Sequence, residues 1–297
     1  MDLRLGTRGS RLARTQSGTV AAALRARGHS VELVVISTRG DEITDRPFAA
    51  IGAPGVFVRE IESALLQGRI DLAVHSYKDL PTDSPDELVV AAVPERVDPA
   101  DVLLVDAGAW FPDGHSLPLA QGSVVGTSSA RRTALLREIR PDLRIEGIRG
   151  NVPTRMEKCR DEPFSAIVLA SAGLLRLQAQ GVHILDGQRV HPLPCSIFVP
   201  APSQGALALQ VLSGSPAEAA VGQLEHGPSR TAVEAERAVL AALEGGCDAA
   251  VGAWCLELSD GWRLHAAFGT DEGVRRAQAT SVHAADCVGP VVRELLG

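Results

Sequence analysis

The chain of 297 residues has little lysine, few cysteines and no long apolar run. Only two of its 29 basic residues are lysines, Lys78 and Lys158, and the other 27 are arginines. Because arginine is accepted almost everywhere, we expect Lys78 to need a compact ammonium rather than a planar fork. No apolar run reaches membrane-span length and no signal-peptide core follows Met1, which favours a cytoplasmic protein without membrane partners.

Further absences exclude several kinds of site. The five cysteines are odd in number and irregularly spaced, which argues against a disulfide framework. No pair has C-x-x-C spacing, so we expect no metal, and the lack of a P-loop or a GxGxxG motif disfavours nucleotide binding. A net charge of −7 argues against nucleic-acid partners.

Positive charge is nevertheless concentrated in one part of this acidic chain. Residues 131–160 contain nine basic side chains and four acidic ones. This local excess indicates a small anionic ligand rather than a polyanion, although a solvated charged face is the alternative.

Strand and helix patterns alternate from the N-terminus. Apolar strands are predicted at 3–5, 31–36, 70–74 and 88–93, with helices at about 10–27 and 57–67. The pattern restarts near residues 94–100, with strands at 102–105, 124–126, 144–148 and 166–169 and a helix at 129–139. This βαβ order predicts two α/β domains with open, largely parallel sheets.

The last third of the chain predicts a return crossing and a third domain. A proline-rich crossing at 191–202 leads to a strand at 205–212 that returns to the first domain, so that two lobes flank a hinged cleft. Two helices from about 216, three strands near 250–258, 262–268 and 274–282, and a last helix predict an α+β domain. The expected domains are 1–94 with 199–214, 100–193, and 218–297.

Four predicted strand-to-helix turns combine small or polar residues with arginine. They are Thr7–Ser10, Gly126–Arg132, Arg149–Arg155 and Ser171–Arg176. Backbone N–H groups at a helix start, hydroxyls and guanidiniums together bind anions. One such turn is commonly just a helix cap, but four at strand ends predict a ligand with several carboxylates or phosphates.

Two further segments carry candidate chemistry. Asp79 follows a buried strand beside Lys78; it is either half of a surface pair or a group that stabilises positive charge or transfers a proton. Cys247 follows Gly245-Gly246 after a helix for which Ser229 is the expected N-cap. The glycines leave room for a bulky group on the thiol, whereas most free cysteines are small buried hydrophobes.

Together these segments resemble the porphobilinogen deaminase (hydroxymethylbilane synthase) family, in family order over nearly the whole chain. The matching stretches are TRGS (7–10), STRGD (37–41), GVFVRE (55–60), AVHSYKDLP (73–81), GTSS (126–129), RR (131–132), RGN (149–151), TR (154–155), QGA (204–206) and LEGGC (243–247). Departures are Pro54 and Arg59 where lysine is common, Pro153 and Ser203 where glycine is frequent, and Ala130 for leucine.

The resemblance implies two α/β domains like type II periplasmic binding proteins around a cleft, plus a C-terminal α+β domain. It implies a dipyrromethane cofactor joined to Cys247 by a thioether, on which a transferase of heme and tetrapyrrole biosynthesis deaminates four porphobilinogen molecules, joins them head to tail and releases hydroxymethylbilane by hydrolysis. Asp79 would be catalytic, and the protein a monomer.

The resemblance also implies which residues bind. Cofactor contacts would come from Ser76, Lys78, Asp79, Ser128, Ser129, Arg131, Arg132 and Gly150. Substrate contacts would come from Arg8, Ser10, Arg149, Arg155, Arg176 and Gln204. The alternatives are a two-lobed anion-binding protein without catalysis and a cysteine hydrolase. The Gly-Gly-Cys turn disfavours the first, and Asp248, which would not activate the thiol, disfavours the second.

Overall fold

The computed structural model describes residues 1–37, 58–112, 116–161, 163–183, 187–243 and 249–297. The chain forms two compact units, Met1–Val97 with Ala206–Thr231 and Asp98–Gly205 with Ala232–Gly297. It therefore passes between the units after Val97, after Gly205 and within one helix after Thr231.

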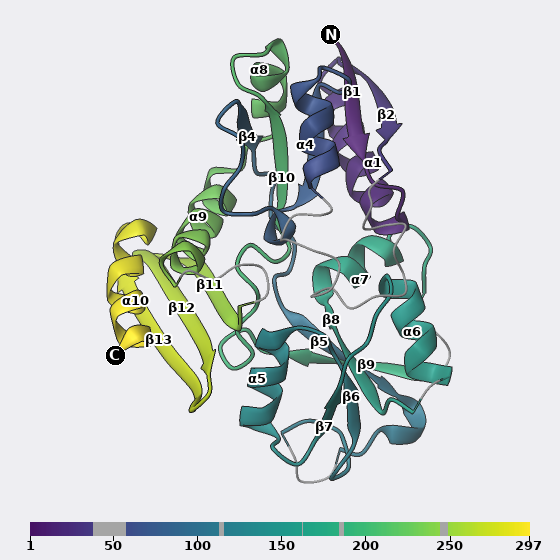
Figure 1. Cartoon of the computed structure of the whole chain (residues 1–297), viewed down its shortest axis with the longest axis vertical. Helices are drawn as coiled ribbons and strands as arrows, with labels where there is room; N and C mark the ends of the chain where they lie inside the picture. The colour runs from purple at the N-terminus through teal and green to yellow at the C-terminus, as the bar shows by residue number, and fades with distance from the viewer. Residues whose placement is uncertain (38–57, 113–115, 162, 184–186, 244–248) are drawn as a thin grey trace. The chain divides into compact units, whose positions relative to one another are not determined.

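The first unit is an α/β sheet with helices on both faces (Figure 1). Its elements are β1 (Asp2–Thr7), α1 (Arg11–Arg25), β2 (Ser30–Val35), α4 (Arg59–Leu66), β3 (Leu72–Ser76), the 3-10 turn η1 (Tyr77–Asp79), β4 (Leu88–Ala92), β10 (Leu207–Leu212) and α8 (Pro216–Gly222). The strand order is β2-β1-β3-β10-β4. β1 is parallel to β2 and β3, whereas β10 is antiparallel to β3 and β4.

Alternating apolar residues give this sheet two buried faces. One core cluster joins Leu3 and Leu5 of β1 to Leu24 of α1 and Val221 of α8. A second cluster on α4 includes Ile61, Leu65 and Ile70. The sheet therefore fixes the ends of β1 and β3, which carry predicted site residues.

The second unit repeats this plan. Its elements are β5 (Asp101–Asp106), η2 (Ala107–Ala109), β6 (Val124–Gly126), α5 (Ala130–Ile139), β7 (Arg144–Glu146), α6 (Val152–Asp161), β8 (Ala166–Ala170), α7 (Ser171–Gln178) and β9 (Gln188–Leu193). The strand order is β7-β6-β8-β5-β9. As in the first unit, the first three strands are parallel to one another, and the fourth, β5, is antiparallel to both of its neighbours. Along β5, Leu103 and Val105 face the α5 side, and Val102 and Leu104 face the α6 side.

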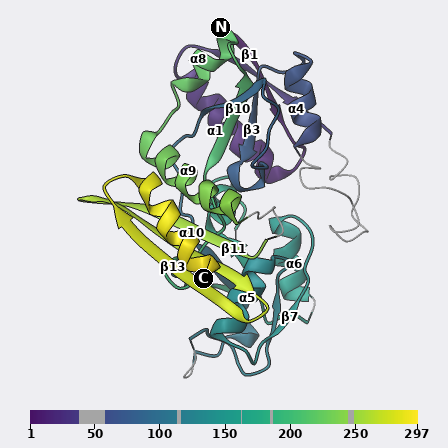
Figure 2. The same ribbon diagram turned by 60° about the vertical axis from the view of Figure 1, so that its left-hand side comes forward.

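A three-stranded antiparallel sheet completes the second unit. It consists of β11 (Val251–Leu258), β12 (Gly261–Thr270) and β13 (Gly273–Ser281), followed by η3 (Ala284–Cys287) and α10 (Val288–Leu296). α9 (Gly227–Ala242), the helix that crosses between the units, and α10 share a core with one face, and Figure 2 shows α10 lying along the strands. β12 also contacts α5, where Arg276 of β13 pairs with Glu138.

These observations confirm the predicted α/β and α+β classes, with two differences. The sheets are mixed rather than largely parallel, because β10 and β5 enter between neighbours of opposite direction. α9 begins at Gly227 rather than after Ser229. The His226 ring accepts from the Ser229 backbone N–H (3.3 Å), and the Ser229 hydroxyl accepts from the Arg96 backbone N–H (2.9 Å), so Ser229 is not the cap. No helix of the described chain is long and apolar enough to cross a membrane.

Candidate functional site

The turn after β6 combines a helix start with two arginines. The Ser129 side chain caps α5 by accepting from the Arg132 backbone N–H, and the exposed Ser128 donates its hydroxyl to the Ile148 carbonyl (2.8 Å). Serine is favoured at this position because its oxygen accepts from a backbone N–H that has no partner within the helix. The turn therefore fixes the first residues of α5, Arg131 and Arg132.

Both arginine side chains are buried and share one carboxylate. Asp101, the first residue of β5, is fully buried and lies 2.8 Å from the Arg131 guanidinium and 2.6 Å from that of Arg132. The sequence analysis missed Asp101. The only hint in the sequence was an acidic residue directly before the apolar run 102–105, because a charged side chain at the start of a buried strand is buried only where it has a partner.

The electrostatics of this group are set by opposite effects. Burial raises the pKa of Asp101, but the two guanidiniums lower it further than burial raises it, so its pKa lies well below the usual range. Burial also lowers the pKa of Arg131, against the attraction of Asp101 and with the repulsion of Arg132. Asp101 is therefore ionised, and the three groups together carry one positive charge.

The turn after β7 places a third arginine at the end of the sheet that carries this pair. Gly150 has a φ of +111°, and a Cβ there would lie 2.7 Å from Thr154 Cγ2, so glycine is required. Arg155 donates its Nε–H to the Gly150 carbonyl (2.8 Å). Burial lowers the pKa of Arg155, and the charge of Arg132 lowers it further. Because β6 and β7 are adjacent parallel strands, the turns after them lie at the same end of the sheet. Arg149, next to Gly150, is half-buried.

Two other predicted residues of the second unit lie beside Gly205. Arg176 in α7 donates to the Gly205 carbonyl (2.8 Å), and burial lowers its pKa to about 10. The Gln204 side-chain amide, in a residue only 1% exposed, donates to Asp101 Oδ1 (3.0 Å) and to the Pro99 carbonyl (2.8 Å). The structure thus places Gln204 in the Asp101 network rather than on a surface.

The segment around Ser203 explains one departure from the family pattern. Ser203 has a φ of +62°, the left-handed region that glycine adopts most easily. Its backbone N–H donates to Glu236 Oε2 (2.7 Å), and Oε1 of the same carboxylate accepts from the Cys255 backbone N–H (2.9 Å). Buried Glu236 therefore holds the segment in a conformation that is unusual for serine.

In the first unit, the predicted residues gather at the ends of β1 and β3. Ser10 caps α1 by accepting from the Ala13 backbone N–H (3.3 Å), and Ser76 accepts from the Gln16 side chain (3.0 Å). In η1, Lys78 is half-buried and Asp79 is exposed. An exposed carboxylate beside these groups is accessible to a ligand.

His75 lies directly before this cluster, in the matching stretch 73–81, and the sequence analysis assigned it no catalytic or binding role. It is buried, and its Nε2 hydrogen-bonds Gln210 Oε1 (3.1 Å), whose amide donates to Glu62 Oε1 (3.0 Å). Burial lowers the pKa of His75 to about 4, the Gln210 bond opposes this shift, and the charge of half-buried Arg8 adds to it. His75 is therefore a neutral neighbour of Arg8.

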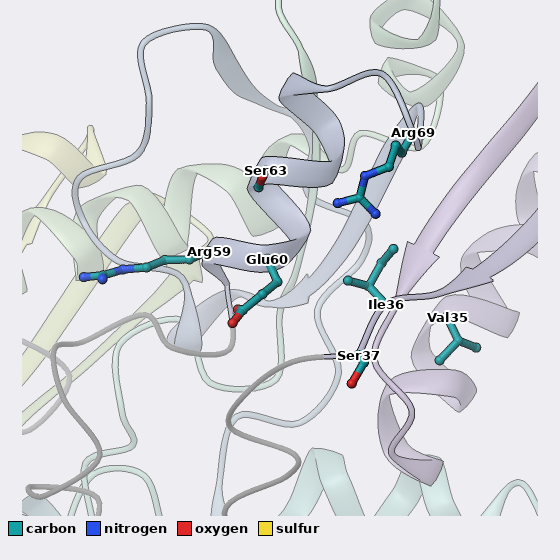
Figure 3. Close-up of a pocket in the computed structure, with 7 residues that line it drawn as sticks. All are labelled: Val35, Ile36, Ser37, Arg59, Glu60, Ser63 and Arg69. Carbon is teal, nitrogen blue, oxygen red and sulfur yellow. The ribbon is translucent and has the colours of Figure 1, made fainter.

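A pocket of about 420 Å³ in the first unit contains none of the predicted site residues. Figure 3 shows its lining, which comes from the end of β2 and the two residues after it, from α4, and from Arg69 after α4. Cys247, Pro54, and residues 38–41 and 55–57 of the matching stretches lie outside the described residues. The ends of α9 at Ala242 and of β11 at Val251 flank the cysteine segment.

Comparisons with known proteins agree with an anion-binding site of this kind. The family described as "Porphobilinogen deaminase, dipyromethane cofactor binding domain" matches residues 3–219. The chain belongs to the porphobilinogen deaminase family. Porphobilinogen deaminase of Rubrobacter xylanophilus is 47% identical over 250 residues, which cover 84% of this chain and 78% of that protein. A probable porphobilinogen deaminase of Methanosarcina barkeri is 39% identical over 286 residues, covering 96% and 84%.

The methionine-binding protein MetQ is a structural neighbour of this porphobilinogen deaminase family member, with a TM-score of 0.44 and 14% identity over 75% of this chain and 89% of MetQ. The predicted recognition, activity and cofactor are confirmed: the chain has porphobilinogen deaminase (hydroxymethylbilane synthase) activity in tetrapyrrole biosynthesis, with a dipyrromethane cofactor.

The donor groups present suit this cofactor. A dipyrromethane carries acetate and propionate carboxylates, and the second unit offers Arg131, Arg132 and Arg155 at the turns that follow two adjacent parallel strands. Guanidiniums and helix-start N–H groups bind carboxylates. Among the described residues, no group of three or more His, Cys, Asp or Glu side chains could hold a metal.

Proposed function

We propose that the chain joins four porphobilinogen molecules head to tail on a dipyrromethane held by a thioether to Cys247, and releases hydroxymethylbilane by hydrolysis. The observation that carries this proposal is the arginine group of the second unit: Arg131 and Arg132 share the buried Asp101 carboxylate, and Arg155 follows the adjacent parallel strand at the same end of the sheet. A growing chain of pyrroles, each with two carboxylates, needs such a concentration of fixed cations.

The binding roles divide between the two units. In the second unit, Ser128, Ser129, Arg131, Arg132 and Gly150 bind cofactor carboxylates through side chains or backbone N–H groups, and Arg149, Arg155 and Arg176 serve the added units. In the first unit, Ser76 and Lys78 contact the cofactor, and Arg8 and Ser10 contact substrate carboxylates. The buried Gln204 amide contributes by holding Asp101 and neighbouring backbone.

The catalytic role falls to Asp79. Loss of ammonia from porphobilinogen leaves an electron-poor azafulvene, and positive charge develops on pyrrole nitrogens during coupling. The cofactor would supply the terminal pyrrole carbon to which the first unit is joined, and each later unit would join the end of the growing chain. Exposed Asp79 stabilises the positive charge and accepts hydrogen bonds from pyrrole N–H groups.

Domain boundaries, a cytoplasmic location and a monomeric state form part of the same proposal. Among the described residues, Cys159, Cys195, Cys255 and Cys287 form no disulfide, which is usual for a reducing compartment. The repeated sheet topology supports two α/β domains, and the antiparallel sheet with α10 supports a third.

Intact mass spectrometry of the purified full-length protein tests the proposal. We expect active protein to carry an adduct equal to two pyrrole units, and Cys247→Ser to lack it. Cys195→Ser is the control, because Cys195 is another cysteine of the same unit, and it should keep the adduct. An unmodified mass in fully active protein contradicts the thioether.

A further inference from the structure

Asp101 is the common acceptor of the arginine pair. Arg131 places Nη2 2.8 Å from Asp101 Oδ2, and Arg132 donates through Nη2 (2.6 Å) and Nε (3.1 Å) to Oδ1. The carboxylate is fully buried, and both guanidiniums are nearly so. Because water is excluded, the two hydrogen bonds from Arg132 fix the plane of its guanidinium against this carboxylate, and the ion pair holds the Arg131 guanidinium beside it.

The remaining contacts of the two guanidiniums are rigid backbone atoms. Arg131 Nη1 donates to the Val199 carbonyl (2.8 Å), and Arg132 Nη1 donates to the Val168 carbonyl in β8 (2.9 Å). Each guanidinium is thus held by the Asp101 carboxylate on one side and by a backbone carbonyl on another. Its remaining N–H donors therefore point in fixed directions.

Gln204 connects Asp101 to the two backbone segments that lead to the first unit. Its Nε2 donates both to Asp101 Oδ1 and to the Pro99 carbonyl. Residues 98–101 and 203–205 are the segments of the second unit that adjoin the chain crossings after Val97 and Gly205. One amide therefore ties both segments to the acceptor of the arginine pair.

We propose that Asp101 is a positioning residue for the dipyrromethane: it orients Arg131 and Arg132 toward the cofactor carboxylates and, through Gln204, fixes them to the backbone beside the crossings. This inference rests on the proposed cofactor role of the two arginines. Because one carboxylate offsets one of two adjacent buried cations, it also lets both remain charged in the absence of ligand.

The predicted signature is a fall in kcat with little change in KM. The cofactor stays attached while porphobilinogen exchanges. Misplaced arginines therefore change the position of the acceptor carbon, whereas the affinity for free substrate stays the same. A displacement of about 1 Å in such a constellation can lower the rate by about 10²-fold.

The test is Asp101→Glu, which keeps the charge and moves the carboxylate by one methylene. Asp142→Glu is the matched control: Asp142 holds Arg140, another buried arginine, at the opposite end of α5 through contacts of 2.7 Å. The readouts are the fraction of full-length protein carrying the adduct by intact mass, the thermal unfolding midpoint, and kcat and KM of the loaded protein.

We expect Asp101→Glu to lose part of its adduct and at least about tenfold in kcat, with KM within about twofold, whereas Asp142→Glu keeps its adduct and kcat. If Asp101→Glu has the same adduct fraction and the same kcat as Asp142→Glu, the proposal is overturned. If Asp101→Glu does not fold, Gln204→Met decides: a drop of about threefold or more in kcat at constant KM supports the proposal, and an unchanged kcat overturns it.

Arg132→Gln separates this inference from the proposed function. Unchanged loading and kcat in Arg132→Gln contradict the cofactor role of the arginines, and with it both ideas. A loss in Arg132→Gln together with a normal Asp101→Glu contradicts only the positioning role of Asp101.

Discussion

At the scale of single residues, Asp79 and Asp101 show two environments for a carboxylate. Asp101 is buried against two guanidiniums and is held permanently ionised. Asp79 is exposed in a 3-10 turn at the end of a buried strand, where a ligand can reach it. The first suits orientation of neighbouring cations, and the second suits contact with a reacting pyrrole.

Replacement of Asp79 by alanine should abolish turnover without removing the cofactor. We expect kcat to fall by at least about 10²-fold, since the only carboxylate proposed to stabilise the developing charge is lost. Intact mass should still show the adduct. Asp83→Ala, an exposed aspartate in the following loop, should keep both adduct and kcat. Turnover of Asp79→Ala close to the native value would falsify its catalytic role.

His75 makes folding stability depend on pH. Its pKa is about 4 in the folded protein and about 6.5 when unfolded, so below pH 6.5 the unfolded chain binds more protons. The free energy of unfolding therefore falls as the pH decreases from 6.5 to 4, by about 3 kcal/mol from this residue. In His75→Gln the urea midpoint should fall less over this range.

The control for this pH effect is His183→Gln, which changes an exposed histidine and should leave the native pH dependence intact. Equal pH dependence in His75→Gln and the native protein contradicts the assignment.

Residue-level prediction from the sequence succeeded where function depends on a local motif. Ser129 and Ser10 were predicted at strand-to-helix turns, and both cap helices there. Asp101 could not be found in this way, because its partners Arg131 and Gln204 lie 30 and 103 residues away along the chain. A single sequence gives no signal for such long-range pairs.

At the scale of elements, the turn between β7 and α6 depends on Gly150. The backbone there has positive φ, and a side chain would also meet Thr154. The Asn151 side chain accepts from the Thr154 backbone N–H (3.0 Å), which starts α6 and sets the direction of Arg155. The predicted arginine turn is therefore a rigid structure rather than a flexible loop.

Gly150→Ala should lower the free energy of unfolding by more than Gly181→Ala. Gly181 also has positive φ (+74°), but a Cβ there would meet nothing within 4 Å. Both variants carry backbone strain of about 1 kcal/mol, and only Gly150→Ala adds a steric clash. Urea unfolding measures the difference. Equal losses in the two variants contradict the contact with Thr154.

The types of the elements were predictable because the spacing of apolar residues and the positions of glycines are read from a few neighbouring residues. Gly68, which follows α4 and has a φ of +63°, is an example. Strand direction was not, because β10 and β5 are inserted between strands distant in sequence. The start of α9 was misplaced by three residues because the Ser229 hydroxyl serves a distant backbone group.

At the scale of the whole molecule, charge is distributed unevenly. The chain carries a net charge of −7, yet one unit buries several guanidiniums near one another. Like charges at such positions repel, and burial removes the water that would screen them. Protein without the cofactor should therefore be less stable than protein with it, because the cofactor carboxylates stabilise only the folded state.

We expect the unfolding midpoint of Cys247→Ser to lie below that of the loaded protein by roughly 3 °C or more, equivalent to about 1 kcal/mol for a chain of this size. Sulfate, a divalent anion, should bind at the vacant arginines and raise the midpoint of Cys247→Ser more than that of the loaded protein. Differential scanning fluorimetry in a sulfate series measures both shifts.

Sodium chloride at the same ionic strength is the control, because it screens charges in both proteins without binding as a divalent anion. Sulfate also strengthens burial of apolar surface in any protein, and this general effect raises both midpoints alike. Only the difference between the two proteins reports on the arginines. If sulfate shifts both midpoints equally, the buried guanidiniums do not interact with the cofactor carboxylates, and the stability gap has another source.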